Sequence, residues 1–409
     1  MNKTQRRAGL AVLSAALVTS VLQAGSAAAA APDQAGQPVG LQTTIDVVAE
    51  GLNTPRGVIW DHNGLRVLVA EAGLGGPSQP NGGICGRANG NALYCYGETG
   101  SVFQFSEFSA PQRIATGLAS IANYSATTGA RLSVLGLHDL SLDGGRLTGV
   151  FGLSGRQLPF RDVELVGGGA PGAIVLGQAA SIDGGTQVTP FGDLARYEEE
   201  QNPLTPVVDA DPYGMYTDAS GTIVADAAGN DVLRVRPDGG IELLVVFPVR
   251  VPAANPADTV ESVPTAVTKG PDGALYIGEL SGFPYYKGEA KVWRLVPGQA
   301  PTVYAGGFTN IADLTFDDRG RLIVLEMSAE GLFAGRGAFG QPHSGDTVTG
   351  RLVRVEPNGT MTDLAGSGLA NPGGVAYVGT FGGRSLFYVT NRTTSADGSG
   401  QLLRLVVQG

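Results

Sequence analysis

Residues 262–279 read SVPTAVTKGPDGALYIGE and show the repeating unit of the chain most clearly. Its opening phrase, SVPTAV, is followed by the turn GPDG and then by the run ALYIGE. Two more short runs follow, AKVWRL at 290–295 and PTVYAGGF at 301–308. Runs of this length, separated by Gly-containing turns, predict four antiparallel strands joined by hairpins.

The same unit recurs along the chain at intervals of roughly 45–80 residues, a spacing typical of β-propeller blades that carry insertions. Its opening phrase occurs six times: NTPRGV (53–58), LGLHDL (135–140), ADPYGM (210–215), SVPTAV (262–267), TNIADL (309–314) and ANPGGV (370–375). The sequence therefore predicts an all-β fold, a six-bladed β-propeller with four-stranded antiparallel blades.

The last unit supplies only three strands before Gly409. The missing strand is found near the other end of the chain, where TTIDVVAEGL (43–52) matches TMTDLAGSGL (360–369) of the fifth unit. We expect residues 43–52 to complete the last blade and close the ring, which leaves no open sheet edge there. An open β-sandwich also gives short alternating strands, but it does not explain six registers of one phrase.

The second unit is the least regular. We expect its outer strands to come from AIVLG (173–177) and TQVTPFG (186–192), and LARYEEE (194–200) to form one or two helical turns.

The N-terminal residues have the features of a secretory signal peptide. Three basic residues precede an apolar stretch at 9–25 and a run of small residues at 26–31. We expect residues 1–31 to be a cleaved signal peptide, 32–40 a short disordered linker and 41–409 a single propeller domain. The Sec route is favoured over the twin-arginine route, because the residues around Arg6 and Arg7 match the twin-arginine signal poorly.

Cleavage removes three basic and no acidic side chains, which leaves 24 Lys and Arg against 37 Asp and Glu. Such an acidic chain does not favour nucleic acid or an anionic membrane as a partner. No later stretch is long and apolar enough to cross a bilayer. We expect a secreted monomer that does not insert into membranes.

Cys85 and Cys95 are the only cysteines. In an exported protein they predict a disulfide. Two free thiols are the alternative, and a metal site is disfavoured because no histidine lies near them in the sequence.

Insertions gather at one end of the predicted disc. Long loops join the second and third strands at about 72–99, 153–171, 280–289 and 327–349, whereas the hairpins at the other end are short. Loops on a rigid scaffold often carry function, so we predict that this end is the binding face. Its predicted ligand-binding residues open the inner strands: Arg56, Asp211, Tyr213, Thr265, Asn310 and Asp313.

A carboxylate ends the second strand in four of the six units. These residues are Glu71, Asp226, Glu279 and Glu326. One interpretation is structural, with each carboxylate accepting hydrogen bonds from backbone N–H groups of its own loop. The other is a metal site, in which several converge near the axis and hold Ca²⁺. We favour the structural interpretation, because a dispersed ring of carboxylates costs less than a cluster of like charges.

His138 and Asp139 open the second inner strand and are candidate catalytic residues. A histidine beside a carboxylate can serve as a general base. The alternative is a buried histidine that only donates a structural hydrogen bond.

Several segments resemble the ScyD/ScyE family of secreted proteins, which are related to the NHL-repeat propellers. The resemblance rests on CYGETGSVFQF, LHDLSLDGGRL, DADPYGMYTDASGTIVADAAGNDVLRV and VPTAVTKGPDGALYIGELSGFP, and on PTVYAGGFTNIADLTFDDRGRLIVLE and NPGGVAYV, so it covers nearly the whole mature chain. It implies export and a propeller fold, and it carries over no reaction and no catalytic residues.

We therefore expect a secreted binding or accessory protein whose long-loop face holds a small molecule, a glycan or a protein. One alternative is a Ca²⁺-dependent, lactonase-like hydrolase that uses the four carboxylates as ligands and His138 as base. A second alternative is a structural component of a cell wall or extracellular matrix.

Overall fold

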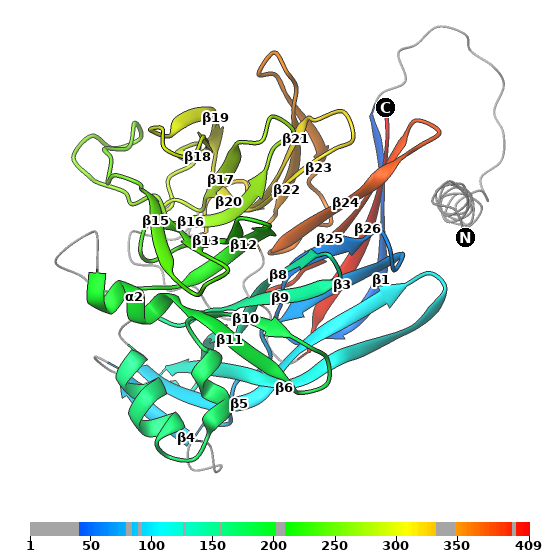
Figure 1. Ribbon diagram of the computed structural model, residues 1–409. Coiled ribbons are helices and arrows are strands. Elements are labelled where there is room, and N and C mark those ends of the chain that lie inside the picture. The colour runs from blue at the N-terminus through cyan, green and yellow to red at the C-terminus, as the bar shows by residue number, and fades with distance from the viewer. Residues whose placement is uncertain are drawn as a thin grey trace, which may run out of the picture.

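The computed structural model describes residues 41–78, 84–88, 92–125, 128–154, 157–201, 209–332, 348–394 and 398–409. These residues form six antiparallel sheets, one per blade (Figure 1). The six-bladed β-propeller predicted from the repeats is confirmed.

The first three blades run from β2 to β15. Blade one holds β2 (Pro55–Asp61), β3 (Arg66–Glu71), β4 (Ile84–Ala88), β5 (Ala92–Ser106), β6 (Ser109–Ser125) and β7 (Arg131–Leu135). Blade two holds β8 (Leu137–Asp143), β9 (Arg146–Phe151), β10 (Gln178–Ile182) and β11 (Val188–Asp193). Blade three holds β12 (Pro212–Asp218), β13 (Gly221–Asp226), β14 (Asp231–Val235) and β15 (Ile241–Val246).

The last three blades follow the same order. Blade four holds β16 (Pro264–Lys269), β17 (Leu275–Glu279), β18 (Ala290–Leu295) and β19 (Thr302–Phe308). Blade five holds β20 (Asn310–Phe316), β21 (Leu322–Ser328), β22 (Arg351–Val355) and β23 (Met361–Ala365). Blade six holds β24 (Gly374–Phe381), β25 (Arg384–Asn391), β26 (Gly400–Gln408) and β1 (Gln42–Leu52).

The ring closes as predicted. Strand β1 pairs antiparallel with β26, from Gln42 opposite Gln408 to Leu52 opposite Gly400. The two strands, blue and red, lie side by side in Figure 1. Arg404 on β26 adds ion pairs to Asp46 of β1 at 3.0 Å and to Glu107 of blade one at 2.7 Å.

Six apolar cores separate the blades, one between each neighbouring pair. The core between blades three and four, for example, joins Ile223 and Val232 to Val267 and Leu275. Both faces of each sheet are therefore covered, which explains why β13 and β17 are buried at every position. Strands of this kind have apolar side chains on both faces.

Blade two corrects part of the sequence analysis. Its third strand is β10 (Gln178–Ile182), and the predicted strand at 173–177 is wrong, because Pro171–Val175 form a short 3₁₀ helix. Pro171 begins this helix, a position that suits its fixed φ and its missing N–H. The predicted helix is confirmed as α2 (Leu194–Gln201).

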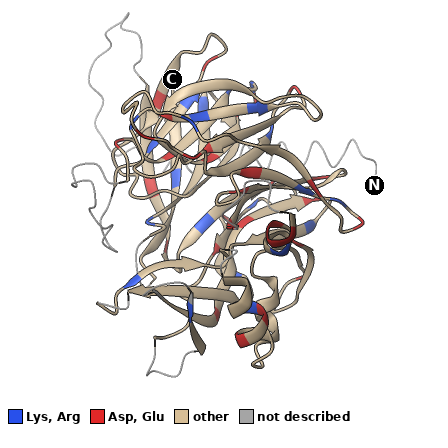
Figure 2. Cartoon of the chain, turned by 90° about the vertical axis from the view of Figure 1, so that its left-hand side faces the viewer, with Lys and Arg blue, Asp and Glu red and all other residues tan. Residues whose placement is uncertain are grey.

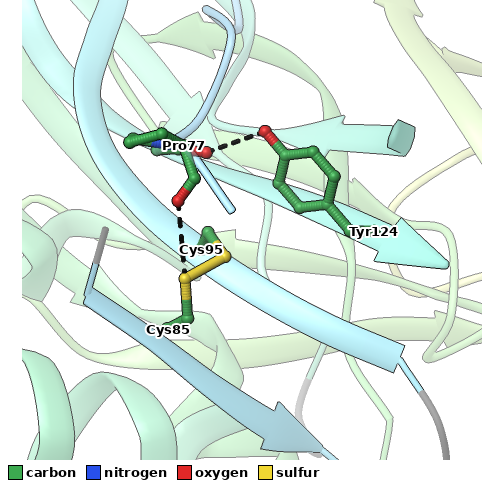
Figure 3. Close-up of a disulfide and its surroundings, with 5 residues drawn as sticks. Pro77, Cys85, Cys95 and Tyr124 are labelled. Atoms are coloured by element: carbon green, nitrogen blue, oxygen red, sulfur yellow. Dashed lines mark hydrogen bonds between the residues drawn. A yellow bond between two sulfur atoms is a disulfide. The ribbon is translucent and has the colours of Figure 1, made fainter. Parts of the chain in front are cut away.

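The disulfide between Cys85 and Cys95 is confirmed. The two residues are direct cross-strand partners on β4 and β5, so the bond fixes the outer strand of the blade-one insertion. Figure 3 shows the bond beside Tyr124, whose hydroxyl donates to the Gly76 carbonyl at 2.9 Å. This insertion is thus a sheet extension rather than a free loop.

The insertions of blades one and two pack together. Blade two contributes a helical segment at Phe160–Val166 and the 3₁₀ helix, and their residues Phe160 and Val175 join Tyr96 of β5 in one core. A Cβ on Gly86 of β4 would lie 2.4 Å from the Phe160 ring, so only glycine permits this contact. Both insertions appear at the lower left of Figure 1.

Residues 1–40, with the expected signal peptide and linker, lie outside the described residues, as does most of the predicted loop at 327–349. In the part of the chain that the structure describes, no helix is long and apolar enough to span a membrane. In Figure 2, basic and acidic residues alternate along the described part of the chain.

Ring closure is testable by deletion. A chain that begins at Asn53 lacks β1, exposes the edge of β26 and removes Leu52, which is 1% exposed. We expect the free energy of unfolding to fall by several kcal/mol, since truncation of one buried leucine alone costs about 2–5 kcal/mol. Urea denaturation and light scattering measure the loss and the expected aggregation through the open edge. A chain that begins at Leu41 is the control, and equal stability of the two chains would contradict the closure.

Candidate functional site

Polar residues at or near the ends of the second strands anchor the loops before the inner strands. Glu71 accepts the backbone N–H of Asn53 at 2.6 Å. In the same way, Asp226 accepts the N–H of Asp211 at 2.7 Å, and Glu326 accepts the N–H of Thr309 at 2.6 Å. In blade six, Asn391 accepts the Ala370 N–H at 2.7 Å in the same way. In blade four, Glu279 accepts from the Ser262 hydroxyl at 2.7 Å.

An arginine neutralises three of these buried carboxylates. Arg113 donates to both oxygens of Glu71 at 2.7 Å. Arg250 donates to Glu279 at 2.7 and 3.1 Å. Arg351 lies 3.5 Å from Glu326.

Each of the four predicted metal ligands thus bonds within its own blade. Within the described ranges, no group of three or more His, Cys, Asp or Glu side chains is arranged to hold a metal ion. The structure supports the structural interpretation of the carboxylate column and does not bring Glu71, Asp226, Glu279 and Glu326 together around Ca²⁺. The lactonase-like hypothesis loses the geometry that motivated it.

Four of the predicted site residues do meet at the long-loop end of the channel. The His138 ring lies 4.8 Å from the Tyr213 ring, and the Tyr213 hydroxyl accepts from Arg56 at 3.0 Å. His138 Nδ1 lies 3.2 Å from the Pro212 carbonyl and 3.7 Å from Asp211 Oδ1. A Cβ on Gly152 would lie 2.0 Å from His138 Cε1, so this glycine admits the ring.

His138 is enclosed rather than presented to a substrate. It is 1% exposed, and burial together with the Arg56 guanidinium lowers the pKa of His138 to about 3. The imidazole is therefore neutral at physiological pH. With Nδ1–H donating to Pro212, Nε2 is the lone-pair nitrogen, and it is buried. This geometry favours the structural role for His138 over the predicted role as general base.

Thr265 and Asn310 also have structural partners. The Thr265 hydroxyl donates to the Ile311 carbonyl of the next blade at 2.7 Å. Asn310 donates to the Leu280 carbonyl at 2.8 Å and accepts from the Leu332 N–H at 3.1 Å. Both residues are buried, so neither offers a free polar group to a ligand.

A cavity of about 270 Å³ occupies the central channel. All six inner strands line it. The lining begins after the first residue or residues of each strand and continues toward the hairpins: Val58–Trp60 and His62, Asp139–Leu142, Met215–Tyr216, Val267–Thr268, Asp313–Thr315 and Val375–Tyr377. The first residues of the inner strands are not part of the lining. The cavity therefore lies on the side of the channel away from the long loops.

Asp139 and Asp313 are the two carboxylates among the described lining residues of this cavity. Each accepts the N–H of the following residue, at 2.8 and 2.7 Å. Each also accepts an N–H from the next blade at 2.8 Å, Met215 for Asp139 and Val375 for Asp313. Blades two and five are three apart in a ring of six, so the pair lies on opposite walls of the channel.

Neither carboxyl is ionised easily. Burial raises the pKa of Asp139 to about 7. Burial and the charge of Asp139 raise the pKa of Asp313 well above its ordinary value. Sequence reasoning named both residues but missed their pairing. The signal was the shared Asp-Leu at the same position of LGLHDL and TNIADL.

No family model matches the chain, and no curated protein matches it. Several solved structures are distantly similar. A gluconolactonase from Xanthomonas campestris is 10% identical over 89% of each chain, with a TM-score of 0.47. A virginiamycin B lyase from Staphylococcus aureus is 13% identical over 89% of this chain and 99% of its own, with a TM-score of 0.42. A regucalcin from Agrobacterium tumefaciens, described as calcium-binding, is 10% identical over 88% and 92%, with a TM-score of 0.42. Similarities this distant support no inference about activity.

Removal of one anchoring carboxylate should destabilise the fold. Glu71→Ala removes the carboxylate that neutralises Arg113 and accepts the Asn53 N–H, so we expect a loss of about 3 kcal/mol in the free energy of unfolding. The control is Glu330→Ala, because the Lys287–Glu330 pair is more than 60% exposed on both sides, and we expect a change of less than about 1 kcal/mol. Urea denaturation measures both. Equal losses would contradict the anchoring role.

Stability should also depend on the carboxyl pair in the channel. A carboxyl whose pKa is raised in the folded state stabilises the fold fully below its ordinary pKa, and this contribution is lost as the pH rises. For Asp139 the window runs from 3.8 to about 7. Each such carboxyl contributes a slope of up to about 1.4 kcal/mol per pH unit.

Asp313→Asn should therefore make the fall in stability between pH 5 and pH 7 shallower, as measured by urea denaturation at each pH. Asp272→Asn is the control, since ion pairing with Arg294 accompanies a lowered pKa for Asp272 and this group stays ionised in that range. An unchanged slope in Asp313→Asn would contradict the coupling.

Proposed function

We propose that this protein is an extracytoplasmic binding protein that takes a small organic cation, such as a primary amine, into its central channel. The single observation that carries the proposal is the channel cavity with Asp139 and Asp313 on opposite walls. The expected export and the confirmed disulfide agree with a protein that works outside the cytoplasm.

The chemistry of the cavity favours a cation over an anion. Its lining holds two carboxyl groups, and no Lys or Arg is among its described lining residues. Trp60, Tyr216 and Tyr377 also contribute to the lining, and aromatic rings attract cations through their faces. The volume of about 270 Å³ suits a small molecule rather than a polymer.

The raised pKa values of Asp139 and Asp313 make the affinity for a cation depend on pH. A bound ammonium favours the ionised form of a neighbouring carboxyl, so binding should release a proton from the pair. Affinity should therefore rise as the pH increases through about 7, where Asp139 titrates. An aliphatic amine with a pKa near that of lysine stays charged over this range.

Calorimetric titration tests the proposal with a panel of small primary amines, with alcohols and carboxylates of the same size as comparisons. We expect binding of at least one amine, tighter at pH 8 than at pH 6. Asp313→Asn should weaken it at least tenfold, whereas Glu330→Gln on the exposed surface should not change it. No heat with any amine, or equal binding of the neutral analogues, would overturn the proposal.

A further inference from the structure

Blade three contains a pair of buried acids that lack the arginine found in blades one, four and five. Asp226 ends β13 and Asp231 begins β14, and the two residues are direct cross-strand partners. They are 1% and 0% exposed. Cβ atoms of such partners lie about 4.5–5.5 Å apart, where like charges destabilise a sheet.

Three of the four oxygens of this pair have no hydrogen-bond partner among the described residues. Asp226 Oδ1 accepts three backbone N–H groups, from Asp211 at 2.7 Å, Gly229 at 2.9 Å and Ala228 at 3.2 Å. Asp226 Oδ2 and both oxygens of Asp231 are buried without a hydrogen bond from any described residue. A buried carboxylate without donors or a counter-charge costs several kcal/mol.

Further negative charge surrounds the pair instead of compensating it. Glu198 on α2 is 2% exposed, and burial, followed by the charge of Asp226, raises the pKa of Glu198 to about 7. Burial and the charges of Asp226 and Glu198 raise the pKa of Asp231 well above its ordinary value. None of the ion pairs formed by the described residues includes Asp226, Asp231 or Glu198.

We infer that Asp226 Oδ2 and the Asp231 carboxylate bind a hard divalent cation, Ca²⁺, with Glu198 adding negative charge nearby. Calcium takes oxygen ligands from carboxylates, backbone carbonyls and water, so two acidic side chains suffice when other oxygens complete the shell. A single proton shared by the pair is a poorer solution, because it neutralises one charge and engages two of the three oxygens, which leaves one buried negative charge and one oxygen without a partner among the described residues.

This cation site differs from the axial calcium site considered in the sequence analysis. It lies within one blade, uses Asp231 and Glu198, and shares only Asp226 with the earlier candidates. The cation neutralises the buried carboxylates of blade three, as an arginine neutralises a buried carboxylate in blades one, four and five. The inference is independent of ligand binding in the channel.

The experiment uses the purified protein after treatment with EDTA and dialysis. We expect calorimetry with CaCl₂ to show one site per chain, and the midpoint of thermal unfolding to rise with Ca²⁺ up to about 1 mM, the range of extracellular calcium modules. No heat and no shift with Ca²⁺ would overturn the inference and indicate neutralisation by protons. An equal shift with Mg²⁺ and Na⁺ would also overturn it, since that reports ionic strength.

Asp231→Asn locates the site. It keeps the shape of the side chain and removes one charge, so we expect at least a tenfold loss of Ca²⁺ affinity and a midpoint in EDTA no lower than that of the unchanged protein. Asp238→Asn is the matched control, an exposed carboxylate in the next turn of the same blade, and it should bind Ca²⁺ normally. Normal binding by Asp231→Asn would contradict the assignment.

A second variant keeps the test decisive if Asp231→Asn does not fold. Glu198→Gln removes the neighbouring charge without touching the turn between β13 and β14. Weaker Ca²⁺ binding by Glu198→Gln supports the site, and unchanged affinity contradicts it.

Discussion

Every blade of this protein has two apolar faces, and both must be buried against neighbouring blades. Six apolar cores, one at each boundary between blades, satisfy this constraint only if the first and last blades also meet. The core between blades six and one joins Leu52 and Val58 to Tyr388 and Leu402, and it exists because β1 pairs with β26. Closure of the ring is thus a condition for burial in all six blades, and the positions of the channel and of the loop ends follow from it.

The buried acids of the ring serve three different purposes. Those that end second strands fix the loops before the inner strands, and an arginine neutralises Glu71, Glu279 and Glu326. Asp139 and Asp313 join the inner strands of neighbouring blades and present carboxyl groups to the channel. Asp226 performs the first task but faces Asp231 instead of an arginine. The same residue type therefore has a different environment in each set, according to which partner the fold supplies.

Most of the fold could be predicted from the sequence, because each blade repeats one phrase and residues 43–52 match a fourth strand. Blade two was mispredicted at 173–177, where an apolar run does not distinguish a strand from a short helix begun by Pro171. The site was less predictable. The column of carboxylates was visible, but Arg113, Arg250 and Arg351 lie outside the repeated phrase, so their pairing needed the structure. The cavity was also missed, because the lengths of the loops pointed to the opposite end of the channel.

The pairing of β1 with β26 also determines which blade is completed last during folding. Asp46 and Arg404 are 358 residues apart. Strand β1 is therefore synthesised long before its partner β26 and cannot pair until β26 is present. Entropy opposes such a long closure only weakly more than a short one, but contacts of this range form slowly. Blades one to five each consist of consecutive strands and can form as the chain emerges, whereas blade six cannot be completed until β26 has arrived. We expect the chain to remain open, and accessible to chaperones and proteases, until its C-terminal strand is released.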